Sequence, residues 1–168
     1  MIDVRIPGKP QGQARGRAGA IYRRGANGPE PLIVGGRVKI RVHDPEPSRN
    51  WKAFAAARIE EAMGGQPLLE GPILAVVESV FELPKSERRK VPRPATWSSS
   101  SKDSDNLAKA VLDAANGIAW KDDREVVFLV SAKLTAAQGE PAYVRLRAWE
   151  LDTEPESMAR VLDVAAQI

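Results

Sequence analysis

The feature that most restricts the fold of this chain is a nearly unbroken apolar run, ILAVVESVFEL, at residues 73–83. A run of this length, rich in Val and Ile, is typical of the central strand of a sheet. Shorter segments at residues 2–6 and 38–42 alternate apolar and polar side chains, which is the pattern of half-buried strands. Residues 126–134 and 142–149 are two further strand candidates, separated by a turn at Gln138-Gly139. The sequence therefore predicts a sheet built around residues 73–83.

Helical spacing occurs in three other places. Apolar residues recur at helical intervals from Pro47 to Met63, where Gly64-Gly65 follows, and again over residues 105–116, where Asn116-Gly117 follows. Pro155 is expected to open a short C-terminal helix. Strands and helices are mixed without a regular βαβ alternation, so we predict an α+β fold. We expect one domain over residues 1–168, with a mixed sheet and two to three helices.

The positive charge of the chain is concentrated in two segments. The net charge is only +3, yet residues 1–52 hold 11 Lys and Arg against 4 Asp and Glu, and residues 85–93 hold 5 against 1. Both segments are rich in Gly or Pro, so we predict long basic loops at residues 8–36 and 84–101. Cationic loops of this kind favour a polyanionic partner.

Several classes of chemistry are excluded by composition. The chain has no Cys and a single His, which excludes disulfides, thiolate nucleophiles and two-His metal motifs. No run of about 18 apolar residues is present, and the N-terminus lacks the apolar core of a signal peptide. We expect a cytoplasmic protein that contacts no membrane and uses no nucleotide cofactor.

Five aspartates lie within residues 102–123, namely Asp103, Asp105, Asp113, Asp122 and Asp123. Carboxylates this close in a basic protein repel one another, and a bound divalent cation such as Mg²⁺ is the usual reason for such clustering. An acidic metal site in a basic protein indicates an enzyme that acts on a polyanion.

The spacing of these residues suggests a geometry. Asp105 stands where a helix cap is expected, and Lys109 follows one turn later on the same face. The segment after Asn116-Gly117 is expected to fold back and bring Asp122 or Asp123 beside the helix start. Carboxylate-held Mg²⁺ with a neighbouring lysine suits phosphodiester hydrolysis. Each feature also has a purely structural explanation as a cap, a surface ion pair or a turn, and spacing alone does not choose between the two.

The same residues resemble a known family signature. The RusA family of Holliday junction resolvases has the pattern D-x-D-N-x-x-K, then L-D-x-x-N-G, then a D-D pair. A similar pattern is present here in Asp103-Ser104-Asp105-Asn106-Leu107-Ala108-Lys109, Leu112-Asp113, Asn116-Gly117, Trp120 and Asp122-Asp123. The strong match covers residues 102–133. Two departures are Lys102, where the family commonly has Pro, and Arg15-Gly16-Arg17 in place of an Arg-Pro-Arg-like core.

The resemblance implies a homodimeric endonuclease of mixed α/β fold that uses Mg²⁺ (or Mn²⁺ in its place), of the kind carried by bacteria and their phages. It implies that Asp103, Asp105 and Asp123 are catalytic metal ligands, with Asp122 as the alternative to Asp123, and that Lys109 is the catalytic lysine. We interpret Asn106 and Asp113 as residues that orient this group.

Other residues are candidates for contact with DNA. Phosphate contacts are expected from cations near the site, which are Lys9, Arg15, Arg17, Arg23, Arg24 and Lys102. The segment from Lys85 to Arg93 is a second candidate surface. Trp97, in a polar loop, is a candidate for insertion at a junction.

The sequence thus predicts a crossover junction endodeoxyribonuclease that resolves four-way junctions in DNA recombination and repair. A junction is two-fold symmetric, and a dimer with two active sites meets the need for paired cuts. Two alternatives remain open, a broader nuclease for flaps and forks and a non-catalytic DNA-binding module of the same fold.

Overall fold

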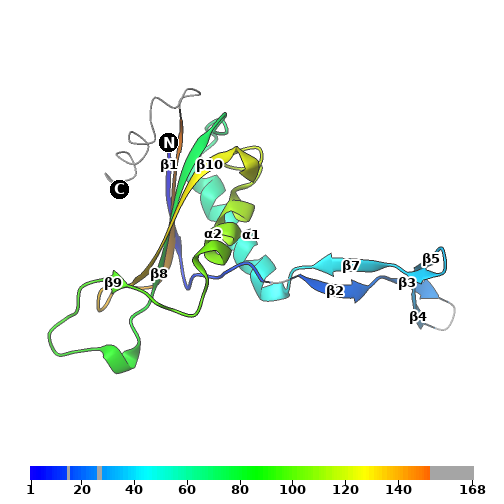
Figure 1. The fold of residues 1–168 in the computed structure, drawn as a ribbon, viewed down its shortest axis with the longest axis horizontal. Coiled ribbons are helices and arrows are strands. Elements are labelled where there is room, and N and C mark those ends of the chain that lie inside the picture. The colour runs from blue at the N-terminus through cyan, green and yellow to red at the C-terminus, as the bar shows by residue number, and fades with distance from the viewer. Residues whose placement is uncertain (15, 26–27, 152–168) are drawn as a thin grey trace.

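A computed structural model describes residues 1–14, 16–25 and 28–151, so the predicted C-terminal helix and Arg15 lie outside the described residues. The body is a five-stranded sheet (Figure 1). Its strands, from one edge to the other, are β1 (Ile2–Pro7), β11 (Tyr143–Glu150), β8 (Ile73–Phe81), β10 (Val126–Thr135) and β9 (Thr96–Trp97). The apolar run therefore forms the central strand, as the sequence predicts.

Strand directions in this sheet are mixed. β8 pairs parallel with β10 and antiparallel with β11, and β1 runs antiparallel to β11. With only two α-helices in the described residues, the α+β prediction is confirmed.

Two helices, α1 (Glu46–Met63) and α2 (Ser104–Ala115), cover one face of the sheet (Figure 1). α1 packs against β1 and α2, and α2 packs against β10 and β8. Their buried side chains meet those of alternate strand positions in one core. Among its members are Val4, Ile6, Ala55, Ile59, Ile73, Val77, Val111, Ala115, Trp120, Val144 and Leu146. This packing fixes where α2 lies on the sheet.

The direction of α2 follows from the strands it connects. Because β8 and β10 are parallel, the helix between them runs back along the sheet, antiparallel to both. Its N-terminus is held level with the middle of β10, since the hydroxyl of Ser131, the sixth of the ten residues of that strand, donates a hydrogen bond to the Ser104 carbonyl at 3.0 Å. The C-terminus of α2 therefore lies near the start of β10.

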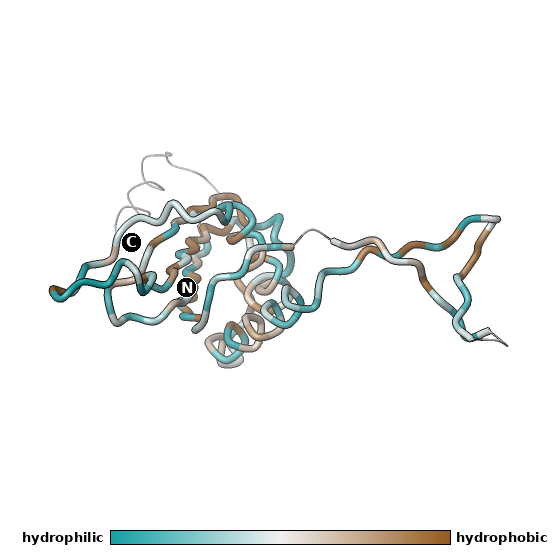
Figure 2. Tube along the Cα trace, turned by 90° about the horizontal axis from the view of Figure 1, so that it is seen from below, coloured by the Kyte–Doolittle hydropathy of each residue, from teal (hydrophilic) through white to brown (hydrophobic). Residues whose placement is uncertain are grey.

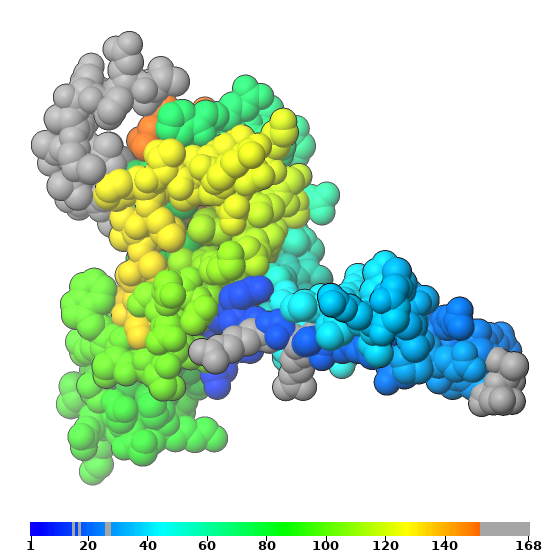
Figure 3. Space-filling view, turned by 45° about the vertical axis from the view of Figure 1, so that its right-hand side comes forward, coloured from blue at the N-terminus to red at the C-terminus, as the bar shows by residue number. Residues whose placement is uncertain are grey.

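The prediction of a long loop at residues 8–36 is wrong for much of this range, which forms β-strands. Residues 16–25 and 28–43, here called the arm, form three two-stranded ribbons that project from the body (Figures 1 and 3). They pair β2 (Arg17–Ala20) with β7 (Ile40–His43), β3 (Tyr22–Gly25) with β4 (Gly28–Pro31), and β5 (Ile33–Val34) with β6 (Arg37–Val38). Local pairing overrides a composition that is otherwise typical of loops.

The arm consists of a stalk, the β2–β7 ribbon, and two branches at its end, the β3–β4 ribbon and the β5–β6 ribbon. The ribbons meet where the Ile21 N–H donates to Lys39 O, the Leu32 N–H donates to Ile21 O and the Lys39 N–H donates to Leu32 O. One branch turns at Gly35-Gly36, where φ values of 58° and 74° favour residues without a side chain. Figure 2 shows the two branches diverging from the stalk.

The second predicted loop, residues 84–101, is largely confirmed. It contains a short 3₁₀ turn, η1 (Lys85–Glu87), and the two-residue strand β9, and is otherwise irregular. Two of its cations are already paired, Arg88 with Glu82 and Arg93 with Glu87, both at 3.0 Å. Among the described residues, no helix is long and apolar enough to cross a membrane.

Candidate active site

The first two aspartates lie at the N-terminus of α2. The helix begins at Ser104, so Asp103, rather than the predicted Asp105, occupies the cap position, and Asp105 lies in the first turn. The Asp103 side chain makes no capping hydrogen bond, although Asn106 Nδ2 donates to its Oδ2 at 3.3 Å. Both carboxylates are exposed at a helix end whose dipole favours negative charge, so they can face a cation or solvent.

Lys109 lies one turn after Asp105 with its side chain 58% exposed. Its Nζ is 3.7 Å from Asp113 Oδ1, which is the i,i+4 pair that the spacing predicts. Asp113 is less exposed, at 22%. A lysine held by a half-buried carboxylate can present its ammonium group outward beside the helix start.

The return segment after α2 is anchored by Trp120. The Gly117 N–H donates to Trp120 O at 2.7 Å, and Trp120 Nε1 donates to Asn116 Oδ1 at 3.0 Å. Trp120 has no exposed surface, so this tight turn is part of the core. It leads to Asp122, whose Oδ1 accepts from the Arg124 N–H at 3.1 Å and thereby caps a short 3₁₀ turn, η2 (Asp123–Glu125).

The expectation that Asp122 or Asp123 returns to the start of α2 within one chain is wrong. η2 does pack against α2, but it directly precedes β10, whose sixth residue, Ser131, is level with the helix start. The Asp122–Asp123 pair therefore lies at the far end of a 12-residue helix that is about 18 Å long. Over the ranges that the structure describes, no three Asp, Glu or His side chains are grouped closely enough to hold a metal ion. The parallel pairing of β8 and β10, which spacing cannot reveal, is the reason.

Lys102 is bound into the site rather than free beside it. Its Nζ donates to Pro10 O at 3.2 Å and Gln11 Oε1 at 3.3 Å, and Lys133 Nζ donates to the Lys102 carbonyl at 2.7 Å. Burial, together with the charge of Lys9, lowers the pKa of Lys102 below its usual range. Lys102 thus ties the segment after β1 to the residues that precede α2.

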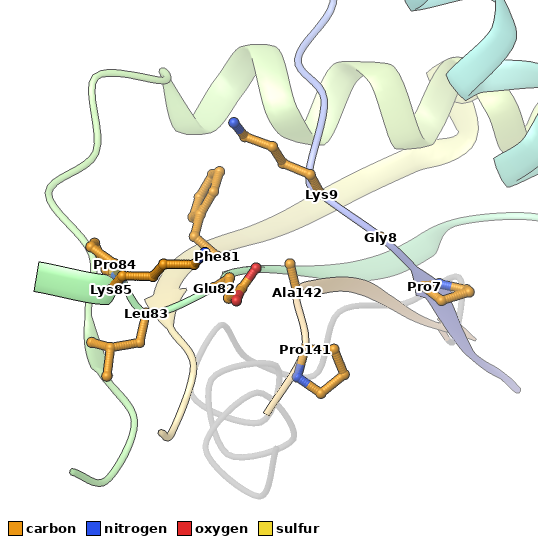
Figure 4. A pocket seen from close by; sticks show the side chains of 10 residues that line it. All are labelled: Pro7, Gly8, Lys9, Phe81, Glu82, Leu83, Pro84, Lys85, Pro141 and Ala142. Atoms are coloured by element: carbon orange, nitrogen blue, oxygen red, sulfur yellow. The ribbon is translucent and has the colours of Figure 1, made fainter. Parts of the chain in front are cut away.

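Lys9 lies on the rim of a surface hollow of about 560 Å³ at the end of the sheet. Its side chain rises on the same side as Phe81 (Figure 4). The other lining residues are Pro7, Gly8, Glu82, Leu83, Pro84, Lys85, Pro141 and Ala142. This hollow is a separate feature from the aspartates, none of which lines it.

The arm carries the other predicted DNA contacts. Arg23 and Arg24 are exposed on β3, with Arg23 3.8 Å from Glu30, and the backbone of Arg17 lies in β2. Sequence reasoning did not single out three further exposed cations of the arm, namely Arg37, Lys39 and Arg41. Lys39 and Arg41 belong to the alternating segment Val38-Lys39-Ile40-Arg41-Val42, which indicated a strand but not where that strand would lie.

The stalk has two chemically different sides. Strand register places Ala18 opposite Val42 and Ala20 opposite Ile40 on one side, with Gly19 opposite Arg41 on the other. Figure 2 shows the resulting apolar stretches along the arm. Val42 is 68% exposed and Ile40 62%, so this side of the ribbon is not part of the core.

Comparison with known proteins identifies a family for this chain. A family model described as endodeoxyribonuclease RusA matches residues 7–147, a range that includes the arm, both helices and all the candidate aspartates. The chain belongs to the RusA endodeoxyribonuclease family. RusA proteins are nucleases that act on branched DNA and resolve Holliday junctions. The chain is also 28% identical to an uncharacterized Bacillus subtilis protein, YqaN, over 101 residues, which are 56% of this chain and 70% of that protein.

In this RusA chain a second ion-pair group adjoins Lys109. Lys52, on α1, places its Nζ 2.5 Å from Asp44 Oδ2 and 3.5 Å from Asp113 Oδ2. The hydrogen bond from Lys52 holds the pKa of Asp44 below its usual range. Burial acts to lower the pKa of Lys52, but its hydrogen bond to Asp44 and the charge of Asp113 outweigh burial and raise it. No spacing rule connects residues 44, 52 and 113, so sequence reasoning missed this group of ion pairs.

Proposed function

We propose that this protein is a Mg²⁺-dependent endonuclease that resolves four-way DNA junctions by paired phosphodiester cleavage. The observation that carries the proposal is the placement of exposed Asp103, Asp105 and Lys109 along one helix beside a cationic arm, in a chain of the RusA family. Carboxylates and a lysine are the groups that phosphodiester hydrolysis needs, and arm cations supply phosphate contacts without reading sequence. The proposed place of action is the bacterial cytoplasm.

We further propose that the active protein is a homodimer in which each metal site draws on both chains. Within one chain the Asp103–Asp105 pair and the Asp122–Asp123 pair lie at opposite ends of α2, and the described residues offer no three-carboxylate group. Mg²⁺ prefers oxygen ligands and commonly uses one or two carboxylates with substrate phosphate and water. A two-fold interface would place the helix start of each chain next to the Asp122–Asp123 pair of the other, twice by symmetry.

Cleavage of defined substrates tests the proposed activity. The protein is incubated with end-labelled four-way junction, flap, fork and linear duplex in Mg²⁺, in Mn²⁺ and in EDTA. We expect symmetric nicks in opposite strands of the junction, with Mg²⁺ or Mn²⁺ required. Equal cutting of flaps and forks would support the broader nuclease instead. Tight junction binding without cleavage in either metal would support the non-catalytic module.

Mixed dimers test the shared site. A dimer of one Asp105→Asn chain and one Asp123→Asn chain is expected to nick junctions at about half the wild-type rate, because one of its two sites then contains only native residues. The Asp105→Asn homodimer and the Asp123→Asn homodimer are the controls, and both should be inactive. If the mixed dimer is as inactive as these controls, each chain builds its own site and the sharing proposal is wrong.

Salt dependence tests contact between the arm and phosphate. Arg24→Gln is expected to reduce the slope of log K against log salt concentration by about 0.9, the value for one lost contact with duplex phosphate. Binding to a catalytically silent junction in Ca²⁺, measured by fluorescence anisotropy from about 50 to 200 mM salt, gives the slope. Arg58→Gln, which removes a cation of α1 paired with Glu61, is the matched control and should leave the slope unchanged. An Arg24→Gln slope equal to wild type would place the arm away from the DNA.

A further inference from the structure

A chain of alternating charges connects the root of the arm to Lys109. In order, it consists of Asp44, Lys52, Asp113 and Lys109. The members come from three separate parts of the fold: the residue that follows the arm, α1 and α2. We propose that Lys52 is a positioning residue that fixes the arm relative to Lys109, an inference that rests on the proposed nuclease function.

Both strands of the arm are fastened at its root. On the incoming side the Gln13 N–H donates to Asn106 O at 2.8 Å, which ties the chain to the first turns of α2. On the outgoing side Asp44 accepts from Lys52, and Gln13 Nε2 lies 3.4 Å from Asp44 Oδ1, which joins the two sides. The helix that carries Asp105 and Lys109 is therefore bonded directly to the base of the arm.

Lys52 holds the two carboxylates of this group together. Its side chain is 20% exposed, and Asp44 and Asp113 are 23% and 22% exposed, so the contacts are partly shielded from solvent. Asp113 uses Oδ2 toward Lys52 and Oδ1 toward Lys109, so the two lysines share one carboxylate. With Lys52 in place the four charges sum to zero. Without it, Asp44 and Asp113 repel each other, and Asp113 interacts with Lys109 alone.

For catalysis, these contacts would align the DNA phosphate with the start of α2. DNA gripped by a projecting arm must present its phosphate at the start of α2, and small misplacements of a reacting group cost up to about 10²-fold in rate. The Lys52 contacts set the angle of the arm at its root and the position of Asp113 behind Lys109. Core packing of α1 through Ala55, Ile59 and Met63 does not involve Lys52, so its role is separable from folding.

Replacement of Lys52 tests the inference. Lys52→Met keeps most of the length of the side chain and removes its charge, whereas Lys52→Arg keeps the charge. We expect Lys52→Met to lower the single-turnover cleavage rate at saturating protein by about 10- to 100-fold, a range set by the alignment cost. We expect Lys52→Arg to restore most of the rate. Arg58→Met, on the same helix and paired with Glu61, is the control and should cleave as wild type does.

Hydrogen exchange supplies a readout that does not depend on activity. In Lys52→Met the amide of Gln13, bonded to Asn106 O, is expected to exchange at least about 10-fold faster, while core amides of β8 are unchanged. If Lys52→Met proves unstable, Asp44→Asn removes the arm end of the chain of charges and should speed Gln13 exchange in the same way. Wild-type exchange at Gln13 in both variants would overturn the coupling, as would a cleavage rate for Lys52→Met close to that of wild type. Absence of cleavage by the wild-type protein would instead refute the proposed function and leave the exchange test valid.

Discussion

Asp105→Asn is expected to lower Mg²⁺-dependent junction cleavage by about 10³-fold, because a carboxylate that holds a cation contributes several kcal/mol to transition-state stabilisation and each 1.36 kcal/mol is tenfold in rate. Asn keeps the shape of the side chain and removes the charge. Asp105 is exposed in the first turn of α2, and its interaction with the helix dipole is worth only about 0.3–1 kcal/mol. The loss should therefore fall on cleavage and not on folding.

The measurement compares single-turnover cleavage in Mg²⁺ with junction affinity in Ca²⁺. We expect the affinity of Asp105→Asn to remain within about threefold of wild type, since removal of a negative charge does not weaken phosphate contacts. Glu61→Gln, an exposed carboxylate of α1, is the matched control and should leave both quantities unchanged. Cleavage by Asp105→Asn at a rate comparable to wild type would place the catalytic centre elsewhere.

Elements with a strong local pattern were predicted well. The apolar run at residues 73–83 became β8 (Ile73–Phe81), and the helical spacing from Pro47 to Met63 became α1. Each of these elements is determined by burial of its own side chains, which sequence periodicity reports directly. The Lys109–Asp113 pair was also predicted, because both residues lie on one helix and their i,i+4 spacing places them on the same face.

The arm was missed for a different reason. Its strands are two to four residues long and contain Gly and Pro, so residues 38–42 are the one arm segment in which the sequence analysis found an alternation. Register and cross-strand hydrogen bonds hold it together, such as those joining Ile21, Leu32 and Lys39. Pairing between strands that are each this short leaves almost no periodic signal in the sequence.

The placement of the aspartates depended on topology. Spacing suggested that Asp122 or Asp123 returns to the start of α2. The sequence of a helix followed by a turn does not show at which end of the helix these aspartates lie. The parallel pairing of β10 with β8 leaves one choice, because the strand must begin where the helix finishes. The Lys52 contacts are hidden for a related reason, since the bond from Lys52 to Asp113 joins residues 61 positions apart.

Trp120→Ala is expected to lower the free energy of unfolding by about 3–5 kcal/mol, the usual cost of removing a large buried aromatic side chain. Trp120 is fully buried among residues of the main core, and its Nε1–H bonds to Asn116 Oδ1 at 3.0 Å. Truncation opens a cavity and leaves that oxygen without its donor. Because domains of this size are stable by only about 5–15 kcal/mol, the variant should lose a large part of its stability.

Urea denaturation followed by circular dichroism measures this loss, with two variants for comparison. Trp97→Ala removes the same side chain from an 80% exposed position on β9 and should change stability by no more than about 0.5 kcal/mol. Trp120→Phe retains an aromatic ring and loses the hydrogen bond, so it should fall between Trp120→Ala and wild type. If Trp120→Ala were no less stable than Trp97→Ala, the turn that carries Asp122 and Asp123 would not be anchored by this residue. The position of that aspartate pair, on which the proposed shared metal site depends, would then need another support.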